Sequence, residues 1–432
     1  MLMVRRTVFW TIDYLKGKPI GKHYKDIKEI IENKNYEALR VDSYLEKLLK
    51  YSTSTVDFYK PYCSYSSLDD FPIINKLVIK EQPEAFISPE YQNNKLHYRK
   101  TSGSTGMPFV FTQDMNKRNR VLASLIYFGQ ICGFELGDKN IYIGVWSEQE
   151  KKSKWTSYKQ NMITVDIKKL GDDELEKIRQ LLKRDKKIKI LFSYASTLDR
   201  FAKYLLNKGD NPEMFNIKTI ISGAEKLQET TRKNLIKVFG CNVVSRYSNN
   251  ENGVLAQECI SELEFHMNNA DFFFEVLKLD SDKPADIGET GRIVVTDLFN
   301  YAMPLIRYDT GDIGVISSNT KCKLKGPVFS RIDGRNSDLI YDTQGLPLNP
   351  NWDFDIDNFS KIRQYQFIQD DKKIYKLIIN CQKGIYPDNV FIRRLKQTLG
   401  EDAQINIEYV DDIPLLSSGK FRQNINNYIR KK

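Results

Sequence analysis

The stretch that decides the fold contains three short apolar runs, KIKILF at residues 187–192, TIISG at 219–223 and CNVV at 241–244. Their length and their content of Ile and Val favour buried strands. The segments between them, 196–207 and 227–239, have the apolar spacing of helices. An alternation of strands and helices predicts a mostly parallel sheet that is covered by helices.

Polar loops follow two of these strands. SGAE at residues 222–225 comes directly after the second run, and YSNNE at 247–251 comes soon after the third. In open α/β sheets, ligands bind at the carboxyl ends of the strands. We therefore expect both loops to line one site.

Two further loops are rich in glycine and hydroxyl groups, TSGSTG at residues 101–106 and SSGKFR at 417–422. Glycine lets a backbone approach a phosphate closely, and backbone N–H groups and hydroxyls can donate to its oxygens. Each loop alone is weak evidence for a phosphate site, since such polar turns are common. Together they predict two parts of one phosphate site, with Lys420 as the positive charge.

The remaining pattern predicts two domains. Strands at 272–279 and 291–298 look antiparallel, and a separate β/α pattern begins after Asp333-Gly334-Arg335. We expect an N-terminal domain over 1–336 and a C-terminal domain over 337–432.

Composition narrows the class of protein. The chain has 432 residues, a formal charge of +10 and six cysteines. No CxxC pair occurs, which predicts reduced thiols in a cytoplasmic protein. The basic residues are scattered and no nucleic-acid module is visible, so nucleic acid is not an expected partner. A basic surface also suits an anionic nucleotide or peripheral contact with an anionic membrane. Residues 1–18 are too interrupted by charge to span a bilayer, and we expect a short amphipathic helix packed against the body.

The longest motifs are GETGRIVVTDL at residues 288–298 and MPLIRYDTGD at 303–312, preceded by LDDFPIINK at 68–76. With these motifs the chain resembles the adenylate-forming superfamily of acyl- and aryl-CoA ligases over nearly its whole length. Within the superfamily it is similar to the phenylacetate-CoA ligase-like branch and its CapK-like proteins, which are associated with capsular polysaccharide biosynthesis. The resemblance implies an α/β fold with a large adenylation domain of mostly parallel sheets and a small β-barrel-like part, followed by a small, mobile α+β lid.

The resemblance also implies site residues. It assigns ATP binding to Thr101, Ser102, Gly103, Ser104, Thr105, Gly106, Gly223, Ala224, Glu225, Tyr247, Ser248, Asp312 and Arg335. Glu251 would bind Mg²⁺, Ser337 would be the hinge, and Lys420, Asn250 and Arg335 would be catalytic. The chain departs from the family at Ser248, where glycine is usual, and at Asn250, where threonine is usual. The phosphate loop also lacks the lysine that often follows it, since residues 107–110 read MPFV.

These roles imply an enzyme that forms acyl-AMP and pyrophosphate from a carboxylic acid and MgATP. CoA is one acceptor for the acyl group, although the weak CoA-facing signature keeps an amine, a sugar or a carrier protein as alternatives. A degenerate, nucleotide-binding relative with a scaffolding role is a second hypothesis.

A metal site is also implied by the resemblance. The branch often carries a Cys, a His and a Cys-x-Cys pair that can hold zinc. Cys259, His266 and Cys322 match three of these positions, while Leu324 takes the fourth. Three of four ligands predict a lost zinc site more than a working one.

Overall fold

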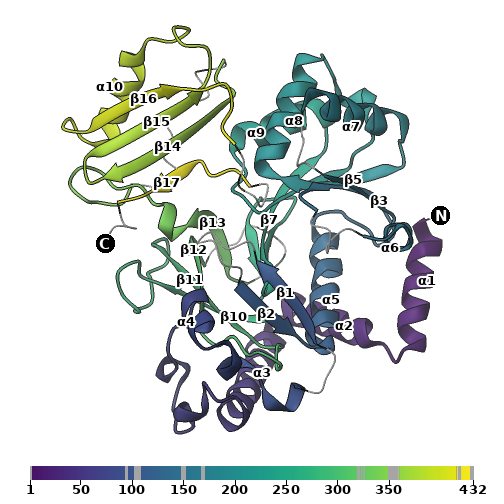
Figure 1. Ribbon diagram of the computed structural model, residues 1–432. Coiled ribbons are helices and arrows are strands. Elements are labelled where there is room, and N and C mark those ends of the chain that lie inside the picture. The colour runs from purple at the N-terminus through teal and green to yellow at the C-terminus, as the bar shows by residue number, and fades with distance from the viewer. Residues whose placement is uncertain are drawn as a thin grey trace. The chain divides into compact units, whose positions relative to one another are not determined.

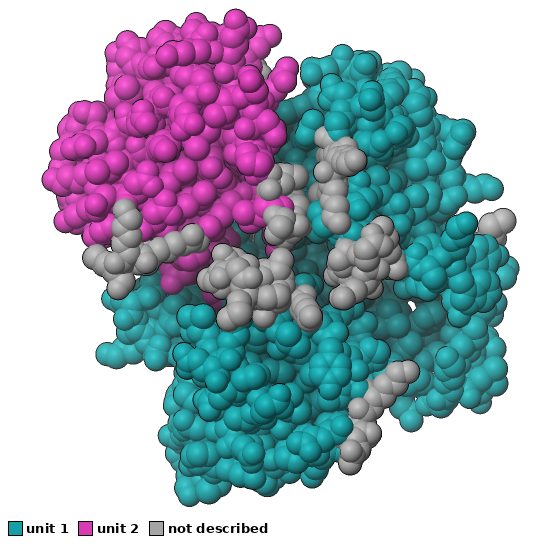
Figure 2. Space-filling view, in the orientation of Figure 1, with its two compact units in different colours: residues 1–310, 314–332 teal, residues 311–313, 333–432 magenta. Residues whose placement is uncertain are grey.

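The computed structural model describes residues 2–92, 96–101, 109–146, 152–166, 171–318, 322, 324, 326–348, 359, 361–414, 416 and 420–428. The chain forms two compact units (Figure 2). Unit 1 comprises residues 1–310 and 314–332, and unit 2 comprises residues 311–313 and 333–432. Each unit has its own hydrophobic core and is described by itself below.

Unit 1 begins with three helices, α1 (Leu2–Leu15), α2 (Pro19–Glu32) and α3 (Lys34–Thr55). Helix α2 packs on α5 (Met115–Ile131) through a cluster in which Ile27 and Ile30 meet Tyr127 and Phe128. The i, i+3 spacing of the isoleucines places them on one face of α2, which is why this helix buries a single stripe. None of the helices in the described part of the chain is both long and apolar enough to cross a bilayer.

Short elements lead from α3 towards the sheets. They are η1 (Lys60–Tyr62), η2 (Leu68–Asp70), α4 (Lys76–Glu81), η3 (Pro83–Phe86) and η4 (Pro89–Tyr91). Strands β1 (His97–Thr101) and β2 (Phe109–Gln113) follow and pair antiparallel, with Thr101 opposite Phe109.

The predicted alternation of strands and helices is confirmed in the middle of unit 1 (Figure 1). The parallel strands lie in the order β7-β6-β5-β3-β4, and their pairing is parallel throughout. Their bounds are β3 (Lys139–Gly144), β4 (Met162–Asp166), β5 (Ile188–Tyr194), β6 (Thr219–Gly223) and β7 (Asn242–Asn249). The connecting helices are α6 (Lys154–Lys159), α7 (Asp172–Arg184), α8 (Ala195–Asn207), η5 (Pro212–Met214) and α9 (Glu229–Phe239).

The other half of this sheet is antiparallel, so the sheet as a whole is mixed. It contains β8 (Gly253–Glu258), β9 (Phe265–Met267), β10 (Phe272–Leu277), β11 (Thr290–Asp297), β12 (Tyr308–Ser317) and β13 (Val328–Arg335). The full order among the described strands is β10-β11-β12-β13-β9-β8-β7-β6-β5-β3-β4. The predicted antiparallel pair is β10 and β11, with Phe272 opposite Asp297.

Unit 2 is the predicted C-terminal α+β element. After η6 (Asn336–Asp338) it contains β14 (Gln364–Asp371), β15 (Ile374–Asn380), α10 (Asp388–Leu399), β16 (Gln404–Tyr409) and β17 (Asn424–Asn426). The strand order is β16-β15-β14-β17, and Phe391 and Leu395 of α10 pack on Phe367 and Leu377 of the sheet. An α/β unit followed by a separate small α+β unit confirms the predicted fold class.

Candidate active site

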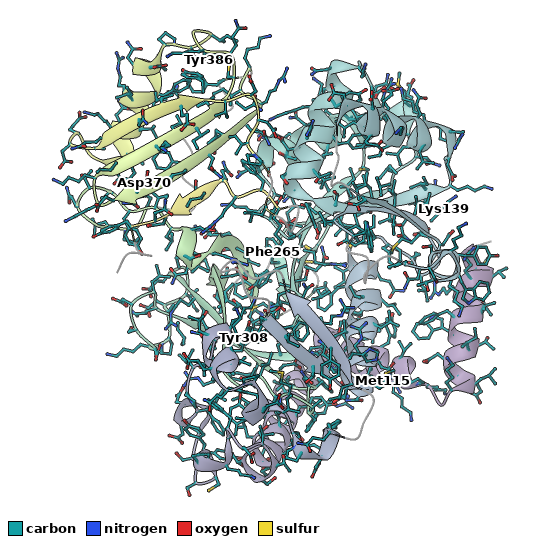
Figure 3. The ribbon with its side chains drawn as sticks, in the orientation of Figure 1. Met115, Lys139, Phe265, Tyr308, Asp370 and Tyr386 are labelled. Carbon is teal, nitrogen blue, oxygen red and sulfur yellow. The ribbon has the colours of Figure 1, made fainter. Side chains whose placement is uncertain are left out.

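Glu251 is the centre of the polar site in unit 1. It lies in the turn between β7 and β8, and it is only 2% exposed. Lys76 Nζ lies 2.7 Å from Glu251 Oε1, and Tyr308, which is labelled in Figure 3, donates its hydroxyl to the same oxygen at 2.8 Å. Gln113 Nε2 donates to the backbone carbonyl of Glu251 at 2.8 Å and so holds the turn. Both side-chain contacts engage Oε1, and the remaining oxygen, Oε2, has the chemistry that a hard cation such as Mg²⁺ prefers.

Two segments far apart in the sequence place Lys76 and Tyr308. Asn75 caps α4 by accepting from the backbone N–H groups of Leu77 and Val78, at 2.8 and 3.2 Å. Ile74 forms a parallel bridge with Tyr308. The motifs at 68–76 and 303–312 therefore lie side by side, which brings a lysine and a tyrosine to the buried carboxylate.

Phe109, which follows the predicted phosphate loop in the sequence, lies beside Lys76. Ser102, Gly103, Ser104, Thr105 and Gly106 are outside the described residues, while Thr101 ends β1. Phe109, which begins β2 opposite Thr101, has its ring centroid 5.9 Å from Lys76 Nζ. Lys76 thus supplies a positive charge close to the C-terminal end of a loop whose own sequence has no lysine.

The loop at 222–225 has a mixed role. Gly223 ends β6, and Ala224 follows with φ +68°, a left-handed conformation that a non-glycine residue rarely adopts. Glu225 Oε2 accepts from the backbone N–H of Ser196 at 2.8 Å, in the first turn of α8. The carboxylate therefore stabilises a helix N-terminus, and this structural contact accompanies the predicted role in ATP binding.

The loop at 247–251 begins at the end of β7. Tyr247 donates its hydroxyl to Thr310 Oγ1 at 3.2 Å, which orients its ring. Ser248 and Asn250, the two departures from the family pattern, are exposed. Their side chains are therefore accessible to a ligand at the carboxyl ends of the strands.

The remaining predicted residues lie in unit 2. Asp312 is half-buried in β12, Arg335 is exposed at the end of β13, and Ser337 is exposed in η6. Lys420 is half-buried, and its backbone carbonyl accepts from the N–H of Leu416 at 2.9 Å. The candidate site residues thus divide between the units, with the lysine on one and the buried glutamate on the other.

Arg246 is a candidate that the sequence analysis missed. It lies opposite Gln257 across β7 and β8, and its Nε donates to Gln257 Oε1 at 2.7 Å. The guanidinium carbon lies 5.8 Å from the centroid of the Phe192 ring, and Nη2 is buried with no hydrogen-bond partner among the described residues. Burial lowers the pKa of this guanidinium. Its neighbours include the Gln257 amide, the Phe192 ring and the Cys132 thiol, which are uncharged when the thiol is protonated, so the guanidinium can bind an anion.

The three residues that match the zinc motif, which the sequence predicts as a lost site, lie together. One ligand atom from each of Cys259, His266 and Cys322 lies within 4.8 Å of the others. The Ser261 hydroxyl is 3.6 Å from Cys322 Sγ and 3.7 Å from Cys259 Sγ. Although burial raises the pKa of Cys259, its hydrogen bond with His266 helps to lower it to about 6. Two sulfur ligands and one nitrogen ligand suit zinc, with the fourth position outside this set of residues.

Comparison with known proteins supports the resemblance. A family described as CapK C-terminal domain matches residues 355–427. Protein CapK of Staphylococcus aureus is 26% identical over 442 residues, which covers 96% of this chain and 94% of that protein. Phenylacetate-coenzyme A ligase of Thermus thermophilus is 31% identical over 150 residues, or 33% of each chain.

Among solved structures, the chain is similar to 2-hydroxyisobutyryl-CoA ligase in the postadenylation state. The TM-score is 0.70 at 16% identity, with 90% of each chain covered. An ATP-bound RpMatB-BxBclM chimera gives a TM-score of 0.55 at 16% identity, over 74% of this chain and 65% of the other. At these identities the likeness concerns the fold. The sequence relatives support the resemblance to the CapK-like, phenylacetate-CoA ligase-like branch of the adenylate-forming ligases, and the solved structures support its fold.

Proposed function

We propose that this protein activates a carboxylic acid with ATP, forming acyl-AMP and pyrophosphate, and then transfers the acyl group to an acceptor. The observation that carries the proposal is the buried Glu251 carboxylate paired with Lys76, whose ammonium lies 5.9 Å from the centroid of the Phe109 ring at the start of β2. A carboxylate for a hard cation and a cation for phosphate oxygens are the two charges that bound MgATP requires.

In the activation step, residues 101–106 hold the β- and γ-phosphates through backbone N–H and hydroxyl groups. Glu251 would hold Mg²⁺, which would neutralise phosphate charge. Lys76, which is 34% exposed, can turn from Glu251 towards the phosphates and replace the missing loop lysine. Asn250 donates from the same turn to a phosphate or acyl oxygen.

Unit 2 supplies the remaining groups. We propose that Asp312 binds the ribose hydroxyls and that Arg335 contacts the ribose or a phosphate. Lys420 approaches the α-phosphate and the attacking carboxylate, where its charge stabilises the charge that builds on phosphorus. The unit then rotates about Ser337, as a lid, for the transfer step.

Arg246 suggests the chemical class of the acid substrate. A partly buried guanidinium next to Tyr247, bounded by Phe192, suits a carboxylate or a second anionic group on an acid with an apolar body. The acceptor is CoA by analogy with the named CoA ligases, and an amine, a sugar or a carrier protein remains the alternative. The CapK relative supports a role in capsular or surface polysaccharide synthesis. All six cysteines are free thiols, which supports a cytoplasmic location.

The test is ATP–pyrophosphate exchange with purified protein and Mg²⁺, across aryl, fatty, amino and hydroxy acids. Exchange with one class of acid, abolished in Lys420→Ala and retained in Lys383→Ala, would establish activation; Lys383 is an exposed lysine of the same unit. Adding CoA, amines or sugars to the active acid would then identify the acceptor. ATP binding without exchange for any acid would favour the degenerate, scaffolding hypothesis, and no ATP binding would overturn the proposal.

A further inference from the structure

In an ordinary surface helix the apolar face is buried and the charged face is exposed. In helix α1 the uncharged half is exposed and the half that carries the charged residues faces the protein. Its charged residues, Arg5, Arg6 and Asp13, lie with Phe9 and Trp10 on one half of the helix, at about 100° per residue. The other half is uncharged, and all of its side chains are exposed; they are Met3, Val4, Thr7, Val8, Thr11, Ile12, Tyr14 and Leu15. The exposed fraction is 80% for Met3, 63% for Val4 and 77% for Leu15.

The orientation of α1 is held by specific contacts, so this exposure is not a frayed terminus. Asp13 is 4% exposed and accepts from the backbone N–H groups of Ile20 and Gly21, both at 2.9 Å, at the start of α2. Trp10 packs against Tyr24 of α2 with ring centroids 5.5 Å apart. Helix α1 therefore packs against the body as expected, and it does so through the half that carries Trp10 and Asp13.

Helix α6 extends the same surface. Arg5 Nη1 donates to the backbone carbonyl of Tyr158 at 2.7 Å, and its guanidinium carbon lies 4.8 Å from the centroid of the Tyr158 ring. Tyr158 stacks on Trp155, with ring centroids 6.0 Å apart, and both residues are 64% exposed. Figure 1 shows α1 and α6 at the same side of unit 1.

Positive charge borders this apolar surface. Lys159 Nζ lies 5.0 Å from the centroid of the Trp155 ring, and Lys154 lies at the other end of α6. Lys16, Lys18 and Lys22 follow α1, and all five lysines are exposed. Exposed aliphatic residues, Trp and Tyr at the edge, and lysines around them are the composition that binds the interface of an anionic bilayer.

We propose that the exposed faces of α1 and α6 form a docking surface for an anionic phospholipid bilayer. The aliphatic side chains of α1 enter the boundary between headgroups and acyl chains, Trp155 and Tyr158 lie at headgroup level, and the lysines contact lipid phosphates. Lipid is favoured over a protein partner because five exposed lysines border an uncharged centre, while Glu135 beside α1 is paired with Arg6 at 3.4 Å. The inference does not depend on the proposed activity, since none of these residues belongs to the candidate active site.

The test is flotation of the full chain with vesicles of phosphatidylcholine alone or mixed with phosphatidylglycerol. We expect binding to the mixed vesicles, weakened by salt, and little binding to phosphatidylcholine. The double substitution Val8→Gln and Ile12→Gln should lower the partition coefficient on the order of tenfold or more, because two partly inserted aliphatic groups are lost. Lys16→Gln with Lys159→Gln should reduce the salt dependence.

Ile287→Gln is the matched control, because Ile287 is 69% exposed in the turn before β11, and this variant should bind as the unchanged protein does. Tryptophan fluorescence emission should shift to shorter wavelength when the protein binds mixed vesicles. Much of this shift should be absent in Trp155→Phe. The proposal is overturned if the unchanged protein binds neither type of vesicle. It is also overturned if the Val8/Ile12 variant binds the mixed vesicles as well as the unchanged protein does. A dimer in light scattering that the same variant converts to a monomer would instead identify a second copy as the occupant.

Discussion

Lys76 and Glu251 form an ion pair of 2.7 Å in which the carboxylate is 2% exposed and the ammonium 34% exposed. A buried carboxylate needs a partner, because an isolated buried charge is strongly unfavourable. The half-exposed lysine can meet that need and still reach an incoming anion. This asymmetry is the reason for assigning Lys76 to phosphate binding and Glu251 to the metal ion.

Lys76→Met should reduce pyrophosphate exchange on the order of 100-fold, because one charged group at the phosphates is lost. The measurement is exchange as a function of MgATP concentration. Lys50→Met is the control, since Lys50 pairs with Glu46 at 2.6 Å on the exposed surface of α3. Equal activity of Lys76→Met and Lys50→Met would show that the charge of Lys76 is structural only.

Glu251→Gln should raise the Mg²⁺ concentration that half-maximal exchange requires, because an amide oxygen is a weaker ligand for a hard cation than a carboxylate. The amide oxygen can still accept from Tyr308, so the fold should be retained, which thermal unfolding would check. Glu46→Gln serves as the matched variant of an exposed pair. An unchanged Mg²⁺ dependence would remove Glu251 from the metal site.

Arg246→Met should raise the KM for the acid on the order of tenfold to 100-fold, because a charge-assisted hydrogen bond is lost. The dissociation constant of ATP, measured by calorimetry in the absence of acid, should stay the same. Arg246→Lys should recover part of the loss, since it retains the charge. A defect in ATP binding of the same size would place Arg246 in a structural or nucleotide-binding role.

Asp297→Asn should destabilise unit 1 by about 3–5 kcal/mol, because it leaves a buried lysine without its partner. Lys117 Nζ lies 2.6 Å from Asp297 Oδ2, and both side chains are 0% exposed. The double substitution Lys117→Met and Asp297→Asn should recover much of this loss. Denaturant unfolding of the two variants provides the comparison, and a double variant less stable than the single one would contradict the expectation.

Acid should weaken the contact between α7 and the loop after α8. Burial alone would raise the pKa of Asp210, but hydrogen bonds from Arg179 and Lys183 lower it overall. A lowered pKa means that the stabilisation is present above the pKa of the unfolded state and is lost as the pH falls through the folded value. Unfolding measured from pH ~6 to pH ~3 should therefore show a steeper loss for the unchanged protein than for Asp210→Asn.

Local patterns were sufficient for much of the fold. The apolar run at 187–192 and its helical neighbours correctly predicted β5 and α8, because burial of one face imposes a strand or helix period on the sequence. The antiparallel half beyond β7 was only partly foreseen, because strand order depends on contacts between distant segments.

The sequence by itself predicts which chemical groups the proposed site contains, since the motifs at 101–106, 247–251 and 417–422 carry glycine and hydroxyl groups, a carboxylate and a lysine. Only the tertiary structure decided that Lys76 meets Glu251 and that, within the described part of the chain, Arg246 Nη2 is buried without a hydrogen bond. It also decided which half of α1 faces solvent, because an amphipathic period defines two faces without choosing between them. Pairing, burial and exposure arise from the packing of segments remote in sequence, and no local pattern encodes them.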